Sequence, residues 1–322
     1  MTQTRPAAVH VRTPATSANL GPGFDALGLA LALYDEVEAE VRPDGRTTVE
    51  VVGEGAGEVP LDASHLVAAA FRAACAAAGE EPPGVALRCR NAVPHGRGLG
   101  SSASAITAGV AAAAGLLGWR GADGGLDRER VFQVAADVEG HPDNVAPCVF
   151  GGFTVSWREG ERWRALPLAP SGRLRPIACI PRERLSTEKA RGLLPAEVPH
   201  ADAAFTAGRA ALLTAAVSGH PELLLEATED RLHERYRRPA MPESARLIAE
   251  LRDQEGLPAV VSGAGPTVLV LGVEPENPSD AGDAGQISAG IADSIRARTG
   301  TGWHIRPLKI DPAGVRITSP RS

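Results

Sequence analysis

The glycine-rich segment 94–104, with the sequence PHGRGLGSSAS, has the composition of a phosphate-binding loop. Three of its residues are regularly spaced glycines: Gly96, Gly98 and Gly100. Glycine permits a positive φ and lets the backbone approach a ligand closely. An Ala-rich helix is expected directly afterwards, over Ala103 to Leu117, so free N–H groups and the positive end of its dipole would face the same ligand. The segment therefore predicts a site for a triphosphate.

Two hydroxyl groups, of Ser101 and Ser102, lie where this loop joins the helix. They could cap the helix or ligate Mg²⁺. The segment is not a Walker A loop, because no lysine follows its last glycine, and the glycine spacing is not that of a Rossmann fingerprint. A serine hydrolase using Ser101 or Ser104 is disfavoured, since neither serine has the two flanking glycines of a nucleophile elbow. A capped helix after a flexible loop, without a ligand, remains the alternative for this segment taken alone.

The composition limits the class of protein. The chain has 322 residues, of which 43% are hydrophobic and 22% charged, and its formal net charge at pH 7 is -6. These values are typical of a globular protein and exclude an intrinsically disordered chain. Nucleic acid is disfavoured as a partner, because no run of Lys and Arg provides a basic face. An anionic ligand stays compatible, since a nest of backbone N–H groups can bind it.

The cysteines and the apolar stretches predict a cytoplasmic protein that does not insert into a membrane. Residues 1–12 lack the apolar region of a signal peptide, and the most apolar stretch, 103–119, is too short and too rich in Ala and Gly to cross a bilayer. The cysteines show no spacing typical of a metal site, and we interpret them as reduced and buried. They are Cys75, Cys89, Cys148 and Cys179.

Apolar patterns along the chain predict alternating strands and helices, typical of an α+β fold in two layers. Strands are expected near residues 9–12, 27–41, 47–52, 85–89, 151–157, 176–180 and 303–310, with a pair around the turn in 260–271. Helices are expected near residues 64–78, 103–117, 128–138, 203–218, 221–227, 243–254 and 287–298. The segment 16–25, TSANLGPGFD, is expected to be a turn. A Pro/Gly-rich stretch at 166–175 predicts a boundary between domains 1–170 and 171–322.

At this point three segments in a fixed order identify a family resemblance. PHGRGLGSSAS resembles the ATP-binding motif P-x-x-x-G-L-G-S-S-[AG] of the GHMP kinases, which include galactokinase, mevalonate kinase and homoserine kinase. TSANLGPGFDALG at 16–28 resembles the first motif of that family in its homoserine kinase form, and SGAGPT at 262–267 resembles the C-terminal glycine motif. The middle segment EGHPDNVAP at 139–147 is again similar to homoserine kinases. Together the motifs outweigh the ligand-free interpretation of the loop.

The resemblance implies a two-domain GHMP kinase fold. The N-terminal domain would be an ATP-binding domain of the ribosomal protein S5 domain 2-like type, and the C-terminal domain would be ferredoxin-like, with both glycine segments at the cleft between them. The implied reaction is Mg²⁺-dependent transfer of the γ-phosphate of ATP to the hydroxyl of L-homoserine, giving O-phospho-L-homoserine for threonine biosynthesis. A homodimer is an expectation from the family alone.

The resemblance also assigns residues to ATP and Mg²⁺. The nucleotide would be bound by the loop and the start of the helix: Pro94, His95, Gly96, Arg97, Gly98, Leu99, Gly100, Ser101, Ser102, Ala103 and Ser104. The expected magnesium ligands are the hydroxyl of Ser102, with Ser101 as the alternative, and the carboxylate of Glu139, with Asp137 as the alternative.

A substrate with an ammonium, a carboxylate and a hydroxyl needs a partner for each group when water is displaced. In the family motifs Asp25 and Asp143 suit the ammonium, and Asn19 and Asn144 suit the hydroxyl or the carboxylate. Turn chemistry is the alternative for both asparagines. His141 is expected to bind substrate, with a capping or packing role as its alternative.

For the substrate carboxylate, a guanidinium fork is the best match in geometry and charge. Thr187 and Arg191 lie in LSTEKARGLLP, which resembles the family segment S-T-x-x-A-R-x-x-L-P. Arg237 lies in DRLHERYR, similar to a family segment ending E-P-Y-R, but Arg235 stands where the family has proline. Arg235 and Arg238 are therefore alternatives to Arg237.

The catalytic set implied by the resemblance is Glu139, Asp143, Asn144 and Arg191. Mevalonate kinase relatives have an Asp at the position of Asn144, and an Asn cannot act as a base, so the hydroxyl proton would leave late, directly to phosphate or through water. Two other functions are open: a GHMP kinase for another small alcohol such as mevalonate, or a non-catalytic ligand-sensing regulator of the same fold. The motifs at 16–25 and 141–147 disfavour the first, and the intact loop with its candidate magnesium carboxylate disfavours the second.

Overall fold

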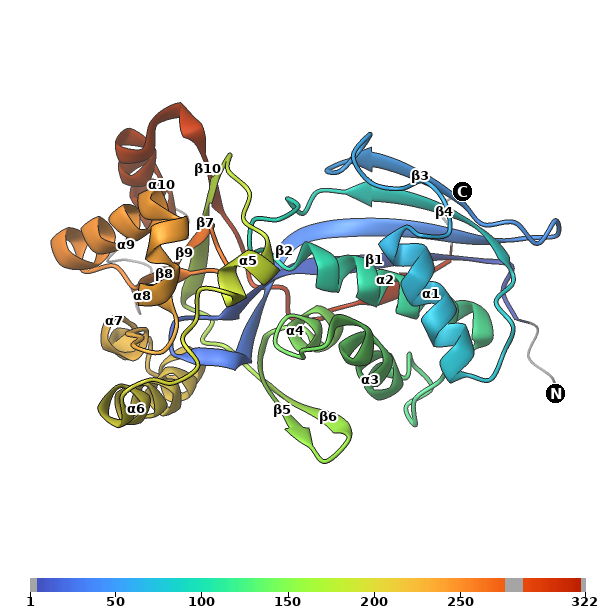
Figure 1. The fold of residues 1–322 in the computed structure, drawn as a ribbon, viewed down its shortest axis with the longest axis horizontal. Coiled ribbons are helices and arrows are strands. Elements are labelled where there is room, and N and C mark those ends of the chain that lie inside the picture. The colour runs from blue at the N-terminus through green and yellow to red at the C-terminus, as the bar shows by residue number, and fades with distance from the viewer. Residues whose placement is uncertain (1–4, 276–285, 320–322) are drawn as a thin grey trace.

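The computed structural model describes residues 5–275 and 286–319. Within these ranges the strands form two sheets that follow each other along the long axis of the molecule, each with helices packed on it (Figure 1). No helix in the described ranges is long and apolar enough to cross a membrane.

The larger sheet contains seven strands of the described residues: β1 (Ala8–Asn19), β2 (Gly23–Arg42), β3 (Thr48–Gly53), β4 (Gly84–Asn91), β5 (Phe153–Glu159), β6 (Arg162–Leu168) and β11 (Arg316–Thr318). Their order is β11-β1-β2-β4-β3, while β5 pairs with β2 and with β6. The helices associated with this sheet are α1 (Leu66–Ala77), α2 (Ser101–Leu117), α3 (Arg128–Glu139) and α4 (Val145–Phe150). The alternating pattern of β2 buries Val37 and Ala39 in a cluster with residues of α1 and α2.

The smaller sheet has the order β10-β7-β9-β8, and its neighbouring strands are antiparallel. Its strands are β7 (Leu174–Pro181), β8 (Ala259–Val261), β9 (Val268–Val273) and β10 (Trp303–Pro307). The helices of this part are α5 (Thr187–Arg191), α6 (His200–Ser218), α7 (Leu224–Ala227), α8 (Glu234–Arg237), α9 (Pro242–Glu255) and α10 (Gln286–Thr299), with 3₁₀ turns at Pro221–Leu223, Arg238–Ala240 and Gly300–Gly302. Numbered along the chain, the strands lie in the order 4-1-3-2 with helices in both crossovers, which confirms the ferredoxin-like prediction.

Strand β1 corrects the prediction of a turn at 16–25. The strand continues to Asn19, and its buried residues Thr16 and Ser17 pair with Ala30 and Leu29 of β2. Only the tip between the strands turns, and there Asn19 and Leu20 adopt positive φ. The run of small polar residues indicated a loop, but in this fold those side chains are buried instead of exposed to solvent.

The two sheets do not divide the chain at one position. The chain passes from the larger to the smaller sheet between β6 and β7, within the Pro/Gly-rich stretch 166–175. Strand β11, however, pairs with β1, so residues 316–318 lie in the larger sheet although the prediction gave them to the second domain. The division into domains 1–170 and 171–322 stays a prediction. One boundary is not enough to describe the two sheets, because the chain returns to the larger sheet at its C-terminal end.

Buried apolar side chains connect the two halves. Besides one cluster on each sheet, a further cluster combines Leu29 and Phe153 of the larger sheet with Leu213 of α6 and Leu269 of β9. The four cysteines are free and buried, as predicted from their spacing.

Candidate active site

The two glycine segments meet between the sheets. Ser262 Oγ donates a hydrogen bond of 2.6 Å to the carbonyl of Gly98 and lies 2.8 Å from Ser17 Oγ. Gly98 has a φ of +76°, and a Cβ at this position would lie 2.2 Å from the carbonyl oxygen of Ser262. Glycine is therefore required where the loop passes the C-terminal glycine motif, as the resemblance implied.

Helix α2 begins at Ser101, two residues earlier than predicted. Its N-cap residue is Gly100, in the left-handed region, and no side chain caps the helix. Interpreting Ser101 and Ser102 as caps is therefore wrong, because both lie inside the first turn. The uncapped N–H groups of this turn border the cavity and are available to an anion.

Asp35 of β2 fastens both ends of the glycine loop. Its Oδ1 accepts hydrogen bonds from the backbone N–H groups of Ala92 and Val93, at 2.8 and 2.9 Å, just before the loop. Its Oδ2 accepts a bond of 2.8 Å from Ser104 Oγ, just after it. Burial raises the pKa of the Asp35 carboxyl, and these three donors lower it in part. This anchor could not be predicted from neighbouring residues, because its partners lie more than fifty residues away.

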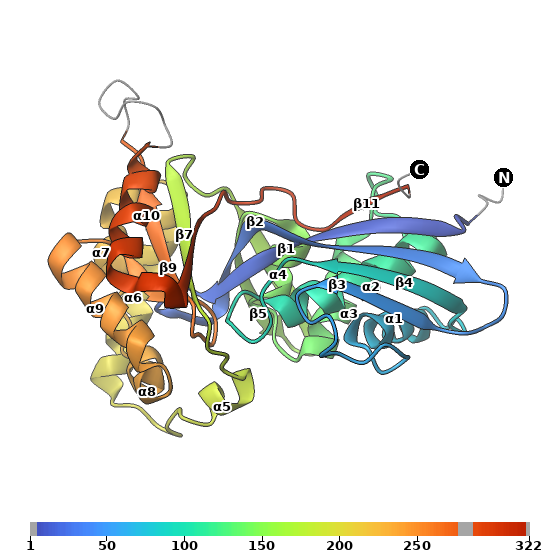
Figure 2. The ribbon, with the colours of Figure 1, turned by 90° about the horizontal axis from the view of Figure 1, so that it is seen from above.

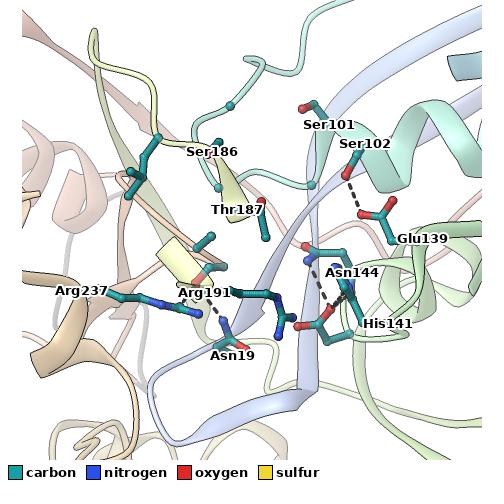
Figure 3. A pocket seen from close by; sticks show the side chains of 17 residues that line it. Asn19, Ser101, Ser102, Glu139, His141, Asn144, Ser186, Thr187, Arg191 and Arg237 are labelled. Carbon is teal, nitrogen blue, oxygen red and sulfur yellow. Dashed lines mark hydrogen bonds and ion pairs between the residues drawn. The ribbon is translucent and has the colours of Figure 1, made fainter. Parts of the chain in front are cut away.

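A cavity of about 160 Å³ opens at the mouth of the loop (Figure 3). It is lined by residues of both halves of the chain: Asn19, Gly96, Gly98, Gly100, Ser101, Ser102, Glu139, His141, Asp143, Asn144, Leu185, Ser186, Thr187, Arg191, Arg237, Gly263 and Ala264. In the close-up, Ser102 and Glu139 lie on one side of this space, and Asn19 and Arg237 lie on the other. The structure thus brings most of the predicted site residues together.

The candidate magnesium ligands contact each other. Ser102 Oγ donates a hydrogen bond of 2.6 Å to Glu139 Oε1. Burial raises the pKa of the Glu139 carboxyl, the bond from Ser102 and the nearby His141 lower it, and Asp143 raises it further. The alternative carboxylate, Asp137, accepts a bond of 2.8 Å from Trp163 Nε1 and does not line the cavity.

The middle motif forms a chain of polar contacts. His141 Nδ1 lies 3.0 Å from Asp143 Oδ1, and this bond raises the pKa of His141 against the opposing effect of burial. The same carboxylate oxygen accepts the backbone N–H of Asn144 at 2.9 Å. Asn144 Oδ1 accepts a bond of 2.9 Å from Thr16 Oγ1, so its side chain is held by β1 and makes no cap on α4.

Thr16 is a site residue that the sequence reasoning did not select. Its Oγ1 holds Asn144, and a Cβ on Gly100 would lie 1.9 Å from the same oxygen. Thr16 therefore connects the first motif, the glycine loop and the middle motif. Its place at the start of TSANLGPGFD could have indicated a role in the site. Because this segment was predicted to be a turn, a threonine hydroxyl there gave no reason to select Thr16 over the other polar residues.

Asn19 has both of its amide groups in use. Its Oδ1 accepts the backbone N–H of Asp25 at 3.0 Å across the hairpin tip, and its Nδ2 donates to the carbonyl of Gly263 at 2.8 Å. These bonds agree with the turn-chemistry alternative, although the residue also lines the cavity.

Arg191 and Arg237, the two residues expected to bind the substrate carboxylate, have different surroundings. Arg191 makes a bidentate ion pair with Asp25, at 2.7 and 3.1 Å, and about a third of its side chain is exposed. Arg237 is 1% exposed, donates to the carbonyl of Gly263 at 2.9 Å, and forms no ion pair with any carboxylate of the described residues. Its Nε has no hydrogen-bond partner, and burial lowers its pKa. Arg237 is therefore a buried cation at the wall of the cavity, and no carboxylate in the described part of the chain lies within ion-pair distance of it.

The alternatives to Arg237 lie elsewhere. Arg235 pairs with Asp202 at 2.7 Å and also donates to Tyr236. Arg238 is exposed, and neither residue lines the cavity. The register of the DRLHERYR segment is thus the one that brings Arg237 to the site.

Some residues assigned to ATP do not line this cavity. Leu99, Ala103 and Ser104 are fully buried, and the Ser104 hydroxyl is used by Thr13 and Asp35, so these residues expose no side chain to the cavity. Pro94 and Arg97 line a neighbouring cavity, together with residues of β10. His95 lies against Gly55, and Asp25 faces Arg191 without lining the cavity.

Comparison with known proteins agrees with this geometry. The model for the GHMP kinases N terminal domain matches residues 65–152, and that for GHMP kinases C terminal matches residues 211–292. The homoserine kinase of Streptomyces avermitilis is 49% identical over 313 residues, which are 97% of this chain and 96% of that protein. The Streptomyces coelicolor homoserine kinase is 48% identical, over 97% of this chain and 95% of that protein. The solved homoserine kinase of Cytophaga hutchinsonii superposes with a TM-score of 0.83 at 25% identity and covers 99% of both chains.

Proposed function

The chain belongs to the GHMP kinase family, and from that premise we propose that it is a homoserine kinase. It transfers the γ-phosphate of ATP to the hydroxyl of L-homoserine and forms O-phospho-L-homoserine. One observation carries the assignment: a single cavity combines a glycine loop and uncapped helix start with a buried, unpaired guanidinium, Arg237. The first pair of features suits a phosphate, and the last suits the carboxylate of an amino acid.

The glycine loop and the first turn of α2 hold the phosphates. Phosphoryl transfer needs mainly positioning and neutralisation of charge, so rigid donors matter more than reactive side chains. The anchoring of the loop by Asp35 and by Ser262 supplies this rigidity.

Ser102 and Glu139 fit a magnesium ion. Both supply hard oxygen atoms, and the Glu139 carboxylate, whose charge burial disfavours, forms no ion pair with a described residue. No group of three or more His, Cys, Asp or Glu in the described ranges could hold a metal by itself, which suits an ion that is completed by substrate phosphates. When bound, Mg²⁺ would neutralise charge on the transferred phosphate.

Asn144 and its neighbours orient the acceptor. Thr16 fixes the Oδ1 of Asn144, and one hydrogen of its Nδ2 is directed to Asp143 Oδ1 at 3.4 Å, which leaves the second hydrogen to donate to the substrate hydroxyl. Asp143, which lines the cavity, is the carboxylate for the ammonium, and Arg191, Arg237 and Thr187 are the partners for the carboxylate. Asp25 lies outside the cavity and is paired with Arg191, so it would reach the ammonium only after that ion pair opens. Asn144 cannot take a proton, so the hydroxyl proton leaves late, to phosphate or to water.

The test is a product assay. Purified protein with Mg·ATP is incubated with homoserine, mevalonate, galactose or shikimate, and the phosphorylated product is identified by phosphorus NMR. We expect O-phosphohomoserine alone. Phosphorylation of mevalonate without that of homoserine would contradict the substrate assignment, and no ATP consumption with any alcohol would favour a ligand-sensing protein.

A homodimer and a cytoplasmic location are proposed from the family alone. Sedimentation of the purified protein at several concentrations tests the dimer. Cell fractionation tests the location.

A further inference from the structure

We propose that His233, which does not line the cavity, is a positioning residue for Arg237. In this view a neutral imidazole between the guanidinium and the β1–β2 hairpin fixes the direction of the carboxylate-binding group. The inference rests on the proposed function, because it takes Arg237 to bind the carboxylate of the substrate.

His233 contacts Arg237 and the hairpin tip at once. Arg237 Nη1 lies 3.2 Å from His233 Nδ1, and His233 Nε2 lies 2.7 Å from the carbonyl oxygen of Gly21. The exposed fractions of the His233 and Arg237 residues are 0% and 1%. Both hydrogen bonds are therefore shielded from water, and loss of either leaves a buried polar atom without a partner.

These two contacts require one protonation state. A guanidinium can only donate, so His233 Nδ1 must be the acceptor and must carry no proton. The carbonyl of Gly21 can only accept, so Nε2 must carry the hydrogen. The neutral Nε2–H tautomer satisfies both, whereas the imidazolium would turn a second N–H toward Arg237. Burial lowers the pKa of His233, and the nearby Arg237 lowers it further, in agreement with a neutral ring.

The other charged groups around the ring are accounted for. Asp230 Oδ2 lies 3.9 Å from His233 Nε2, but the Asp230 carboxylate accepts the backbone N–H groups of residues 232–234. Asp25 on the hairpin attracts a proton to the ring, and Asp25 is itself paired with Arg191. The centroid of the Phe24 ring lies 5.0 Å from that of the imidazole. On balance the desolvation and Arg237 keep the ring neutral.

The contact also explains why Arg237 can point into the site without a carboxylate. Its Nη1 is held between His233 Nδ1 and the Gly263 carbonyl, while its Nε is unpaired. Because these two contacts fix Nη1, the remaining N–H donors of the Arg237 guanidinium are directed to an incoming anion. Little side-chain entropy of Arg237 is therefore lost when the anion binds.

Two isosteric variants separate the two contacts of His233. In His233→Asn the side-chain oxygen can replace Nδ1 as the acceptor for Arg237, and the bond to Gly21 is lost. In His233→Gln the amide N–H can replace Nε2–H, and the acceptor for Arg237 is lost. We expect His233→Gln to raise the KM for homoserine by roughly 10- to 100-fold and His233→Asn to raise it less, with the KM for ATP little changed. His220→Gln, a change at an exposed histidine, is the matched control.

The pH profile gives a second readout that a structural role would not move. For the wild type the KM for homoserine should rise on acidification, since protonation of His233 removes the acceptor, and because burial lowers the pKa of His233 this rise should begin at a lower pH than for an exposed histidine. The rise should be absent in His233→Asn. This comparison decides the matter even if His233→Gln fails to fold. An identical acid rise in His233→Asn, or an unchanged KM in a folded His233→Gln, would overturn the inference. If Arg237→Ala itself leaves the homoserine KM unchanged, the proposed role of Arg237 fails instead.

Discussion

At the scale of single residues, the two arginines of the site should differ in their contribution. Arg237 is buried without a counter-ion, whereas Arg191 is paired with Asp25 and one third exposed. We expect Arg191→Ala and Arg237→Ala each to weaken homoserine use by roughly 2–4 kcal/mol in kcat/KM, with Arg237→Ala at the upper end. Arg191→Lys should recover only part of the loss, because an ammonium cannot make the bidentate contact. Steady-state kinetics with homoserine and ATP varied separately tests this, and near wild-type kcat/KM in both alanine variants would show that the carboxylate is bound elsewhere.

The magnesium ligand is a second question at this scale. Glu139 contacts Ser102 at the cavity, whereas Asp137 of the same helix is bonded to Trp163 outside it. Glu139→Gln should weaken the apparent affinity for Mg²⁺ by at least about tenfold. Asp137→Asn is the matched control, since its amide oxygen can still accept from Trp163, and it should leave the Mg²⁺ titration unchanged. The opposite pattern would make Asp137 the ligand. Because burial raises the pKa of Glu139, wild-type activity should also fall on acidification at a higher pH than for an exposed glutamate.

At the scale of secondary-structure elements, Asp35 connects β2 to both ends of the glycine loop. Asp35→Ala leaves three buried donors unpaired, so we expect a loss of about 3 kcal/mol or more in the free energy of unfolding and a higher KM for ATP. Asp35→Asn keeps an acceptor oxygen, and the Ser104 hydroxyl can reverse its bond, so this variant should stay close to wild type. Urea unfolding and ATP titration measure both effects. A stable Asp35→Ala protein with normal ATP binding would contradict the anchoring role.

A second buried carboxyl, on α8, should make stability depend on pH. Glu234 Oε1 accepts the backbone N–H of Val261 in β8, and burial raises the pKa of this carboxyl from 4.5 to about 7. As the pH rises, the unfolded chain therefore loses this proton at a lower pH than the folded chain does. The free energy of unfolding falls as the pH rises from about 4.5 through about 7. Glu234→Gln keeps the acceptor and removes the titration. Between pH 5 and 8 the free energy of unfolding, measured with urea, should fall by up to about 3 kcal/mol more in the wild type than in the variant. Parallel pH profiles would show that the group is not buried as described.

The sequence predicted what is local and missed what depends on distant contacts. The glycine loop and α2 were predictable because glycine spacing and an Ala-rich run are properties of neighbouring residues. Thr16 and Asp35 were not, since each acts through partners more than fifty residues away. His233 was not either, because only its second contact, to Gly21 across the two sheets, distinguishes it from an ordinary neighbour of Arg237. The short helices α4, α5 and α8 and the edge strand β11 were missed for the same reason. Each is too short for a periodic pattern and is stabilised by tertiary packing.

At the scale of the whole molecule, the chain passes between the two sheets more than once, and one cluster of buried apolar side chains contains residues of both. The tip of the β1–β2 hairpin reaches into the part that contains the smaller sheet, where Gly21 contacts His233 (Figures 1 and 2). In the other direction, β11 returns from the smaller sheet to pair with β1. The cavity is lined by residues of both halves of the chain. The β1–β2 hairpin and β11, which connect these halves, therefore keep the two sides of the cavity together.

This shared core predicts that the two halves unfold together, unlike many two-domain proteins. Leu29 is 1% exposed and belongs to the cluster that includes Leu213 and Leu269, so Leu29→Ala removes packing from both halves. We expect a single calorimetric transition in the wild type, and a lower Tm with still one transition in the variant, at a cost of roughly 2–5 kcal/mol. Leu61→Ala, at a residue that is 56% exposed, should leave the Tm unchanged. Two resolved transitions, of which Leu29→Ala moves only the one belonging to the larger sheet, would mean that the cluster does not couple the halves and that the walls of the site can separate independently.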